Sequence, residues 1–320
     1  MNISSDLIKI LALAIDTLIK AAGIDVRLHG IENVPTNQPV IYVINHFTRM
    51  ETVLMPYIII KNMNKEAISL AHESFFTGKM KDFLDNVGAV STADPNRDKI
   101  LIHELLTDSH PVIIFPEGQI IKDKKIIEKG KYIVYNAGIR RPPHSGAARL
   151  ALQAEFIRNK LRTFQLQGDK VSMARTASRF DLNQADMEKI ISKETHIVPV
   201  NITYYPVRAR ENVLSRLAGK YFKNISTRFH EELEVEGPVI LGKADIDINF
   251  GKPLPVKKYL ASKWKLRRMV SNRNVYLNMG DFKKIPAFKK LRVKMMYDYM
   301  HAIYQMTTVN HDHIMSYILT

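Results

Sequence analysis

The stretch that decides the fold is Pro39-Val40-Ile41-Tyr42-Val43-Ile44-Asn45-His46-Phe47-Thr48-Arg49-Met50-Glu51-Thr52. Its first half is an uninterrupted apolar run rich in β-branched residues, which is typical of a strand buried on both faces of a parallel sheet. A histidine and an acid follow directly, where that strand would end. Because open α/β sheets bind their ligands at this end of their strands, the stretch predicts a fold class and a site together.

The spacing of His46 and Glu51 predicts how the two side chains meet. On one regular helix, five residues would set them roughly 140° apart. They meet only if His46 lies in the turn and Glu51 in the first turn of the following helix. Glu51 would then hold one ring nitrogen of His46 and leave the other free as a base. The alternative is a structural histidine at a strand end, with Glu51 on a solvated helix face.

The rest of the chain alternates between strand and helix patterns. We expect helices at 7–22, 51–62, 79–86, 98–107 and 146–159, and strands at 25–30, 39–44, 67–71, 88–91, 112–115, 195–205 and 246–251. This alternation predicts an α/β fold with a mostly parallel central sheet flanked by helices. The strand at 246–251 alternates apolar and polar residues, a pattern that predicts a sheet edge.

A length of 320 residues, with 46% hydrophobic and 25% charged residues, predicts one large domain with appendages or two small domains. We expect an N-terminal amphipathic helix within 1–24, a central domain over 25–256, and a basic, mainly helical extension over 257–320. The polar segment 158–194 resembles an insertion that covers the site or contacts a partner.

The charge predicts an anionic partner. The net charge is +15 and the pI about 9.7, values that suit a membrane surface, a nucleic acid or phosphorylated substrates. Between Lys263 and Lys294, eleven basic residues stand against one acidic residue. This run is either a solvated face or a membrane or nucleic-acid surface. The first helix, apolar apart from a narrow polar stripe, either docks on the core or lies in a membrane interface.

Several kinds of chemistry are excluded by residue type. The chain has no cysteine, which excludes disulfides, thiolate catalysis and Cys-ligated zinc. It has no metal-type His spacing and no G-x-S-x-G nucleophile element. We expect no membrane-spanning helix and no secretory signal, because Lys9, Asp16 and Lys20 interrupt the first apolar stretch.

Four short elements occur in a distinctive order: Asn45-His46 with Glu51, Gly88-Ala89-Val90 with Arg97, Phe115-Pro116-Glu117-Gly118, and Val198-Pro199-Val200. In this order the sequence resembles the glycerolipid acyltransferase family that makes phosphatidic acid. The resemblance covers about residues 25–256 and includes Ser145 to Ala151 and the closing Phe250 to Leu254.

Two positions depart from the family's pattern. Glu51 replaces an aspartate, and Gln119-Ile120 replaces a Thr-Arg pair whose arginine is thought to hold the acceptor's phosphate. Arg97, Lys122, Lys124 or Lys125 could take that arginine's place, and the alternative for the lysines is an exposed loop.

The resemblance implies transfer of a fatty acyl group from acyl-CoA or acyl-carrier protein to a lysophospholipid (lysophosphatidate-like) hydroxyl, without a metal or redox cofactor. His46 would be the general base and Glu51 its orienting partner. The implied substrate-binding residues are Asn45, Arg49, Arg97, Phe115, Pro116, Glu117, Gly118, Gln119 and Lys122.

The implied location is the cytoplasmic side of a membrane, as a peripheral or monotopic enzyme. The first helix and the basic extension would both contact an anionic lipid surface. One alternative is an inactive protein of the same fold that binds membranes. A further alternative is a nucleic-acid-binding protein, although no recognised nucleic-acid motif is present and we expect no nucleic acid as a partner.

Overall fold

The centre of the fold is a sheet in which the strand of the opening stretch is a middle member. The computed structural model describes residues 3–118, 120, 127–128, 130–136, 139–205, 245–272, 281–309, 311, 314–315 and 318. In sheet order the strands are β1 (Val26–His29), β11 (Asp245–Phe250), β10 (His196–Tyr205), β2 (Val40–Ile44), β5 (Val112–Ile114), β3 (Ile68–Ala71) and β4 (Ala89–Ser91), with β12 (Leu254–Pro255) beside the start of β10. The strands from β10 to β4 are parallel to one another, and β10 pairs antiparallel with β11. The predicted mostly parallel sheet is confirmed.

Strand β2 shows why its sequence is apolar at every position. Val40, Tyr42 and Ile44 pack into one hydrophobic cluster, and Ile41 and Val43 pack into the other. Successive side chains of a strand point to opposite faces, so helices must cover both faces of the sheet.

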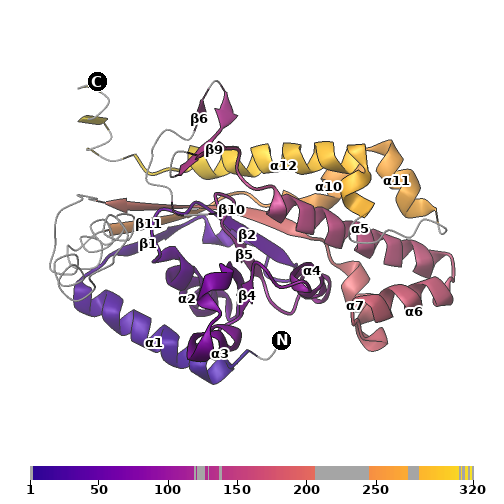
Figure 1. The fold of residues 1–320 in the computed structure, drawn as a ribbon, viewed down its shortest axis with the longest axis horizontal. Coiled ribbons are helices and arrows are strands. Elements are labelled where there is room, and N and C mark those ends of the chain that lie inside the picture. Colours follow the sequence, from indigo (N-terminus) through magenta and orange to yellow (C-terminus); the bar gives the residue numbers. More distant parts are fainter. Residues whose placement is uncertain are drawn as a thin grey trace.

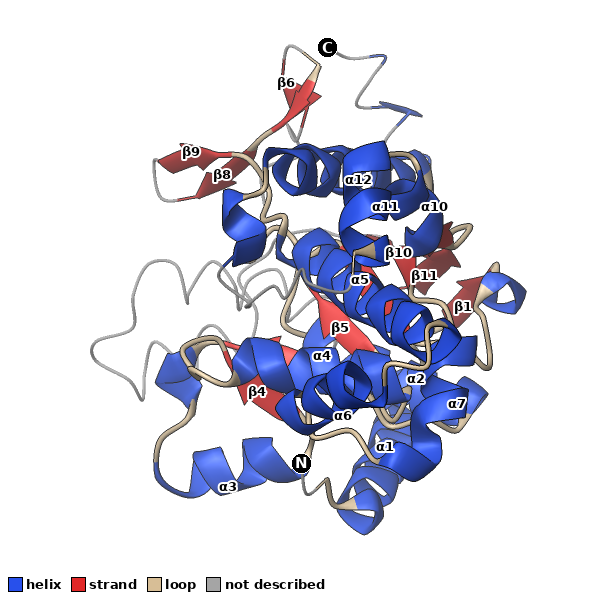
Figure 2. Cartoon of the chain, turned by 90° about the vertical axis from the view of Figure 1, so that its right-hand side faces the viewer, coloured by secondary structure: helices blue, strands red, loops and turns tan. Residues whose placement is uncertain are grey.

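Figures 1 and 2 show these two helical layers on opposite sides of the sheet. One layer holds α1 (Ser5–Ala22) and α2 (Glu51–Met63). The other holds α4 (Arg97–Thr107), α5 (Gly146–Leu166), α7 (Met187–Ser192), α10 (Val256–Ala261), α11 (Trp264–Ser271) and α12 (Pro286–Gln305). The remaining elements in the described residues are the helices α3 (Gly78–Asn86) and α6 (Lys170–Arg179) and the 3-10 helices η1 (Ile31–Asn33), η2 (Glu73–Phe75), η3 (Gln184–Asp186) and η4 (Asp281–Lys284). Two short antiparallel strand pairs complete this described part: β6 (Ile127–Glu128) with β7 (Lys131–Tyr132), and β8 (Val134–Asn136) with β9 (Ile139–Arg141).

The predicted edge position of 246–251 is wrong. β11 lies between β1 and β10, so among the described strands β1 is the one at this edge of the sheet. The polar side chains of β11 have protein partners where the pattern suggested water. Arg27 lies 3.0 Å from Asp247, and the Asn249 amide donates to the Thr308 hydroxyl at 3.1 Å. Partners that come from distant segments cannot be read from the alternation of one strand.

The segment 158–194 does not cover the site. α5 continues past the predicted end at Asn159 to Leu166, and Arg158 is fully buried. Its guanidinium donates to Thr195 Oγ1 at 2.6 Å and to the Leu105 carbonyl at 2.5 Å. Thr195 immediately precedes β10, so these contacts lie where the parallel strands begin. His46 follows the end of β2, at the other end of the sheet.

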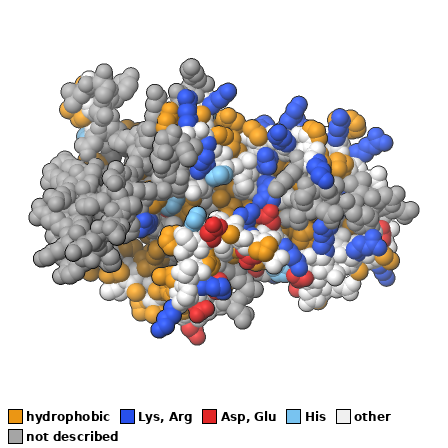
Figure 3. Space-filling view, in the orientation of Figure 1, with side chains coloured by type: hydrophobic (Ala, Val, Ile, Leu, Met, Phe, Trp, Pro, Cys, Tyr) orange, Lys and Arg blue, Asp and Glu red, His pale blue; other side chains and the backbone are white. Residues whose placement is uncertain are grey.

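The two appendages lie on opposite faces of the sheet. α1 packs on the core through Ala12, Ile15 and Ile19. An apolar stripe on its other side is exposed, comprising Ile10, Leu13, Ala14, Leu18 and Ala21. The basic surface lies on α11 and α12 with their flanking residues, in the opposite layer, and comprises Lys263, Lys265, Arg267, Arg268, Lys289, Lys290 and Lys294. Figure 3 shows lysine and arginine side chains gathered over the upper edge and apolar side chains at the lower left. In the described part of the chain, no helix is long and apolar enough to cross a membrane.

Candidate active site

His46 and Glu51 meet in the way their spacing predicts. α2 begins at Glu51, and His46 lies in the turn before it. His46 Nδ1 lies 3.1 Å from Glu51 Oε2. The same carboxylate accepts the backbone N–H of Thr48 at 2.8 Å. Since an ionised carboxylate only accepts hydrogen bonds, Nδ1 carries the proton and Nε2 keeps its lone pair.

The His46 ring is held in place but remains accessible. It stacks on the Phe115 ring with the centroids 4.4 Å apart and 27° between the planes. Its side chain is 13% exposed, whereas that of Glu51 is fully buried. A buried orienting acid and a partly exposed imidazole are the arrangement that a general base requires.

The Asn45 side chain joins β2 to β10, whereas the sequence predicts that it contacts substrate. Its side-chain oxygen accepts the Ile202 N–H at 2.7 Å, and its amide donates to the Ile202 carbonyl at 2.9 Å. Both halves of the amide are therefore engaged by β10. These two hydrogen bonds fix the end of β2, and the turn with His46 follows directly.

Glu117 approaches the histidine turn from the neighbouring strand. β5 lies beside β2, so the turn after each strand falls at the same edge of the sheet. Glu117 Oε2 accepts the backbone N–H of His46 at 2.7 Å, and Glu117 Oε1 accepts from the Tyr304 hydroxyl. Glu117 is 1% exposed, and this burial raises the pKa of its carboxyl to about 8.

Two basic side chains that were not singled out from the sequence lie beside this turn. Arg141 Nη2 donates to the Glu117 carbonyl at 2.8 Å. His144 donates its backbone N–H to the Pro116 carbonyl at 2.7 Å. Burial lowers the pKa of His144, and the charge of Arg141 lowers it further. Among the residues that the structure describes, no carboxylate pairs with Arg141, so its charge is available to an anion.

The close packing of Arg141 and His144 against this turn requires a glycine at position 118. Its φ is +68°, a left-handed conformation that favours glycine. A Cβ at this position would lie 2.5 Å from His144 Cδ2 and 3.3 Å from Arg141 Nη2. A side chain here would therefore displace the two basic residues.

The remaining expected site residues fall into three groups. Arg49 is exposed at the start of α2. Arg97 differs from expectation, because its guanidinium is engaged by Asp98 at 2.9 Å and by the Thr92 carbonyl at 2.7 Å. Gln119, Lys122, Lys124 and Lys125 lie outside the described residues.

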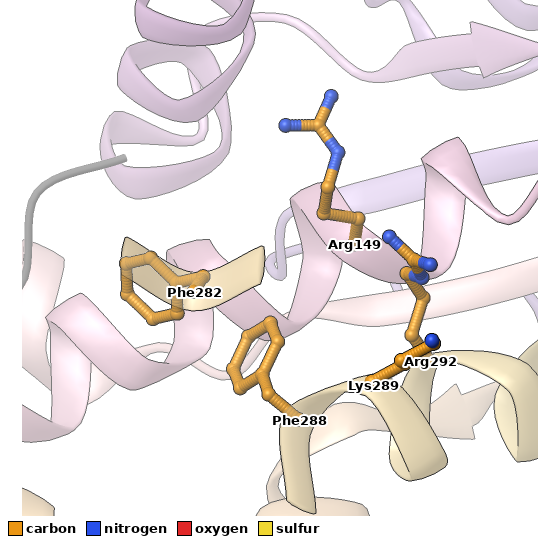
Figure 4. Close-up of a pocket in the computed structure, with 5 residues that line it drawn as sticks. All are labelled: Arg149, Phe282, Phe288, Lys289 and Arg292. Atoms are coloured by element: carbon orange, nitrogen blue, oxygen red, sulfur yellow. The ribbon is translucent and has the colours of Figure 1, made fainter. Parts of the chain in front are cut away.

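Figure 4 shows a second basic cluster, at a small pocket between α5 and α12 that is lined by Arg149, Phe282, Phe288, Lys289 and Arg292. Its volume is about 10 Å³, which is about the space of one water molecule. Arg149 already pairs with Asp98 at 2.9 Å. This pocket is too small to hold a substrate headgroup.

Arg141, His144 and Tyr304 contact the turn of Glu117 but were not expected there from the sequence. Arg140-Arg141 directly before Pro142-Pro143 was a usable signal, because a paired basic dipeptide at a chain break is conspicuous. Tyr304 gave no such signal, because its spacing to Tyr297 and Met300 predicts packing only. Among the residues described, no group of three or more His, Asp or Glu side chains is placed to hold a metal ion.

Comparisons with known proteins bear on this geometry. A family model described as Acyltransferase matches residues 25–203, more than half of the chain. Among solved structures, the chain is similar to the 1-acyl-sn-glycerophosphate (LPA) acyltransferase PlsC from Thermotoga maritima. The sequence identity is 15%, covering 87% of this chain and 80% of that chain, and the TM-score is 0.37. No curated protein matches this sequence. The family match includes β2, His46, Glu51 and Glu117, and it confirms the family indicated by the four sequence elements: the chain belongs to the acyltransferase family and is an acyltransferase.

Proposed function

We propose that this acyltransferase moves a fatty acyl group from acyl-CoA or acyl-carrier protein to the hydroxyl of a lysophospholipid, with His46 as the general base. The observation that carries the proposal is the contact between His46 Nδ1 and the buried Glu51 carboxylate at 3.1 Å. That contact orients the ring and leaves Nε2 free to accept a proton.

In this mechanism the substrate supplies the nucleophile. Nε2 of His46 takes the proton of the acceptor hydroxyl as that oxygen attacks the thioester carbonyl. The tetrahedral intermediate collapses, the C–S bond breaks, and the imidazolium returns its proton to the leaving thiolate. The reaction therefore needs no covalent enzyme intermediate and no metal or redox cofactor.

Four backbone amides in the described part of the two turns are already engaged and are therefore not available to the oxyanion of that intermediate. The N–H groups of His46, Phe47 and Thr48 already donate to Glu117 or Glu51. The Gly118 N–H donates to the Phe115 carbonyl at 2.9 Å. We therefore assign the electrostatic contribution at this site to side-chain cations, of which Arg141 is adjacent to Glu117.

Arg141 also supports a phosphorylated acceptor. The family's arginine is missing at Gln119-Ile120, but Arg141 brings a guanidinium back to the same turn from β9. A half-buried guanidinium without a carboxylate partner in the described chain is well suited to a phosphate. We propose a lysophosphatidate-like acceptor, with Arg141 and His144 at its phosphate.

The acceptor's lipid chain places the enzyme on a bilayer, and the apolar stripe of α1 is the proposed contact. Leu13 is 69% exposed and Leu18 is 66% exposed. α1 and α2 share a layer, and α2 begins at the site, so a lipid reaching His46 from this side has a short path. We place the enzyme peripherally on the cytoplasmic surface, where its thioester donors are made.

The basic surface is not part of this proposed membrane contact. The sheet lies between the helical layer that holds α1 and the layer that holds α11 and α12 (Figure 1), so a flat bilayer against the α1 stripe would not also touch the basic surface. We propose that it attracts the anionic donor. Lys289→Glu with Lys290→Glu should raise the KM for the donor and leave vesicle binding unchanged. Weakened vesicle binding with an unchanged donor KM would assign the surface to lipid.

The function is tested by acyl transfer from labelled acyl-CoA and acyl-carrier protein to a panel of lysophospholipids, glycerol 3-phosphate and monoacylglycerol. We expect transfer to a phosphate-bearing lysolipid, lost in His46→Ala. Transfer to none of these acceptors by protein that still binds vesicles would contradict the proposal and favour a membrane-binding protein without activity.

The membrane contact has its own test, vesicle binding of Leu13→Lys with Leu18→Lys. Burying one leucine contributes about 1.5–3 kcal/mol, so we expect binding to weaken by at least tenfold. Leu166→Lys is the matched control, because Leu166 is 88% exposed but lies at the end of α5. Equal weakening in the control would contradict a specific role for α1.

A further inference from the structure

Helix α12 reaches the carboxyl group of Glu117 through Tyr304. α12 follows the family-matched residues 25–203, and Tyr304 lies in its last turn. The Tyr304 hydroxyl donates a short hydrogen bond to Glu117 Oε1. The Tyr304 ring stacks on Tyr132, with the centroids 6.1 Å apart and 21° between the planes.

The rest of α12 holds Tyr304 in place. Its inner face is buried against the sheet and α5 through Phe288, Leu291, Met295, Tyr299 and Ile303. Tyr299 is fully buried, and its hydroxyl donates to the His144 carbonyl at 2.9 Å. The helix therefore contacts the loop that carries Arg141 and His144 as well as Glu117.

Glu117 links Tyr304 to the turn that carries His46. One of its carboxyl oxygens accepts from Tyr304, and the other accepts the His46 backbone N–H at 2.7 Å. In the described part of the chain, these two hydrogen bonds are the ones that reach this carboxyl. A carboxyl group buried without an arginine or lysine depends on such donors, so losing one disturbs the other.

We propose that Tyr304 is a positioning residue for acyl transfer: by holding Glu117, it fixes the backbone at His46 and makes the C-terminal helix part of the catalytic machinery. This inference rests on the proposed function, in which His46 is the base. Its physical reason is that a general base must be held in the geometry of attack, since a displacement of about 1 Å can reduce the rate by roughly 10²-fold.

The protonation state of Glu117 gives the inference a distinctive readout. The carboxylate form accepts both hydrogen bonds, whereas the protonated form has one acceptor oxygen fewer. Burial raises the pKa of Glu117 to about 8, and the Tyr304 hydroxyl opposes that rise. Removing the hydroxyl should therefore move this pKa further up. The active, ionised form would then appear only at higher pH.

The test compares Tyr304→Phe with Tyr259→Phe. Tyr259 donates to Asp298 Oδ2 at 2.6 Å, so it makes the same tyrosine–carboxylate contact with α12 but away from His46. For Tyr304→Phe we expect kcat about tenfold lower, which corresponds to one hydrogen bond of about 1.4 kcal/mol. We expect an unchanged KM for both substrates. The acid limb of the kcat–pH profile should move up by about one pH unit. Tyr259→Phe should leave the rate and the profile unchanged.

Two further measurements separate positioning from general packing. In the Glu117→Gln background, Tyr304→Phe should cause no further loss of kcat, because the residue through which it acts is already altered. Titration of the Glu117 carboxyl by ¹³C NMR should show a higher pKa in Tyr304→Phe than in the wild type. This NMR measurement does not depend on activity.

The inference is overturned if the Tyr304→Phe profile superimposes on the wild-type profile, if its loss adds fully to that of Glu117→Gln, or if the Glu117 titration does not move. These results would leave the proposed function intact as long as the wild type transfers acyl groups. Absence of transfer by the wild type would instead remove the proposed function, and the positioning role with it.

Discussion

Two buried polar clusters lie at opposite ends of the parallel strands, and they balance their charge in different ways. Where the strands begin, Glu155 pairs with Arg158 at 2.7 Å, with both side chains fully buried. Where the strands end, Glu51 and Glu117 are buried beside His46 and Tyr304. In the described chain, neither of these two acids has an arginine or lysine partner.

The difference separates a cluster that joins structural elements from the cluster at the candidate active site. The guanidinium of Arg158 also donates to the Ile190 carbonyl at 3.0 Å and to Thr195 Oγ1 at 2.6 Å, so it joins α5 to α7 and β10. Its charge is neutralised and its donors are used. The cluster at the other end buries two acids without a cationic partner in the described chain and leaves one imidazole nitrogen free, an arrangement that costs stability and is typical of functional sites.

The largest effect is expected from removing His46, the proposed base, at the end of the strands where the buried acids have no cationic partner in the described chain. His46→Ala should lower kcat by about 10²–10⁴-fold while the free energy of unfolding changes little. Steady-state transfer assays and chemical denaturation measure the two quantities. His72→Ala, which removes an exposed histidine, should leave both unchanged. Activity above a tenth of the wild type in His46→Ala would show that another group is the base.

Breaking the ion pair between Glu155 and Arg158, where the parallel strands begin, should lower the free energy of unfolding. Arg158→Ala leaves the Glu155 carboxylate buried without its cation, and we expect a loss of about 3–5 kcal/mol in the free energy of unfolding. Denaturant titration measures this change. Lys81→Ala breaks an exposed ion pair with Asp85 and should change stability by less than about 1 kcal/mol. A similarly small effect of Arg158→Ala would mean that this cluster does not hold the helices to the sheet.

The pH dependence of stability sharpens the comparison. The pKa of Glu117 is about 8 in the folded protein, and an unfolded glutamate titrates near pH 4.3. Between these values the folded state binds a proton that the unfolded state has released. This group therefore makes stability fall as pH rises, by at most about 1.4 kcal/mol per pH unit.

Glu117→Gln removes that titration. The free energy of unfolding of this variant, relative to the wild type, should therefore increase steadily from pH 5 to pH 8. Glu73→Gln, at an exposed site, should show a constant difference. A constant difference for Glu117→Gln as well would mean that Glu117 is ionised throughout this range.

The smallest effect is expected at Arg141, the cation beside Glu117. Arg141→Gln should raise the KM for a phosphate-bearing acceptor about tenfold, the effect of one charge-assisted hydrogen bond of about 1.4 kcal/mol. The KM for an acceptor without phosphate should not change. Arg140→Gln alters the neighbouring, exposed arginine and serves as the control. Equal changes for both acceptors would assign Arg141 to holding the turn.

Much of the fold could be predicted because its signals are local. The apolar run 40–44 and the spacing from His46 to Glu51 contain the information for a buried strand, a turn and a helix start. Other predictions failed where a distant partner decides. The alternation in 246–251 predicts an edge strand, but Asn249 is satisfied by Thr308, which no pattern within the strand reveals. The expectation that 158–194 covers the site fails for the same reason, because Arg158 pairs with Glu155 and donates to the Ile190 and Leu105 carbonyls, where the parallel strands begin. That the segment is an insertion stays a prediction.

The sequence by itself determined the family, the parallel sheet and the pair His46 and Glu51, because each depends on residues that are close together in the chain. Only the tertiary structure decided that Arg141 returns to the turn of Glu117 and that Tyr304 holds the buried carboxyl from the C-terminal helix. It also decided that the apolar stripe of α1 and the basic surface face away from each other. The physical reason is that hydrogen bonds, charge balance and exposure at these positions are set by packing between segments far apart in the chain.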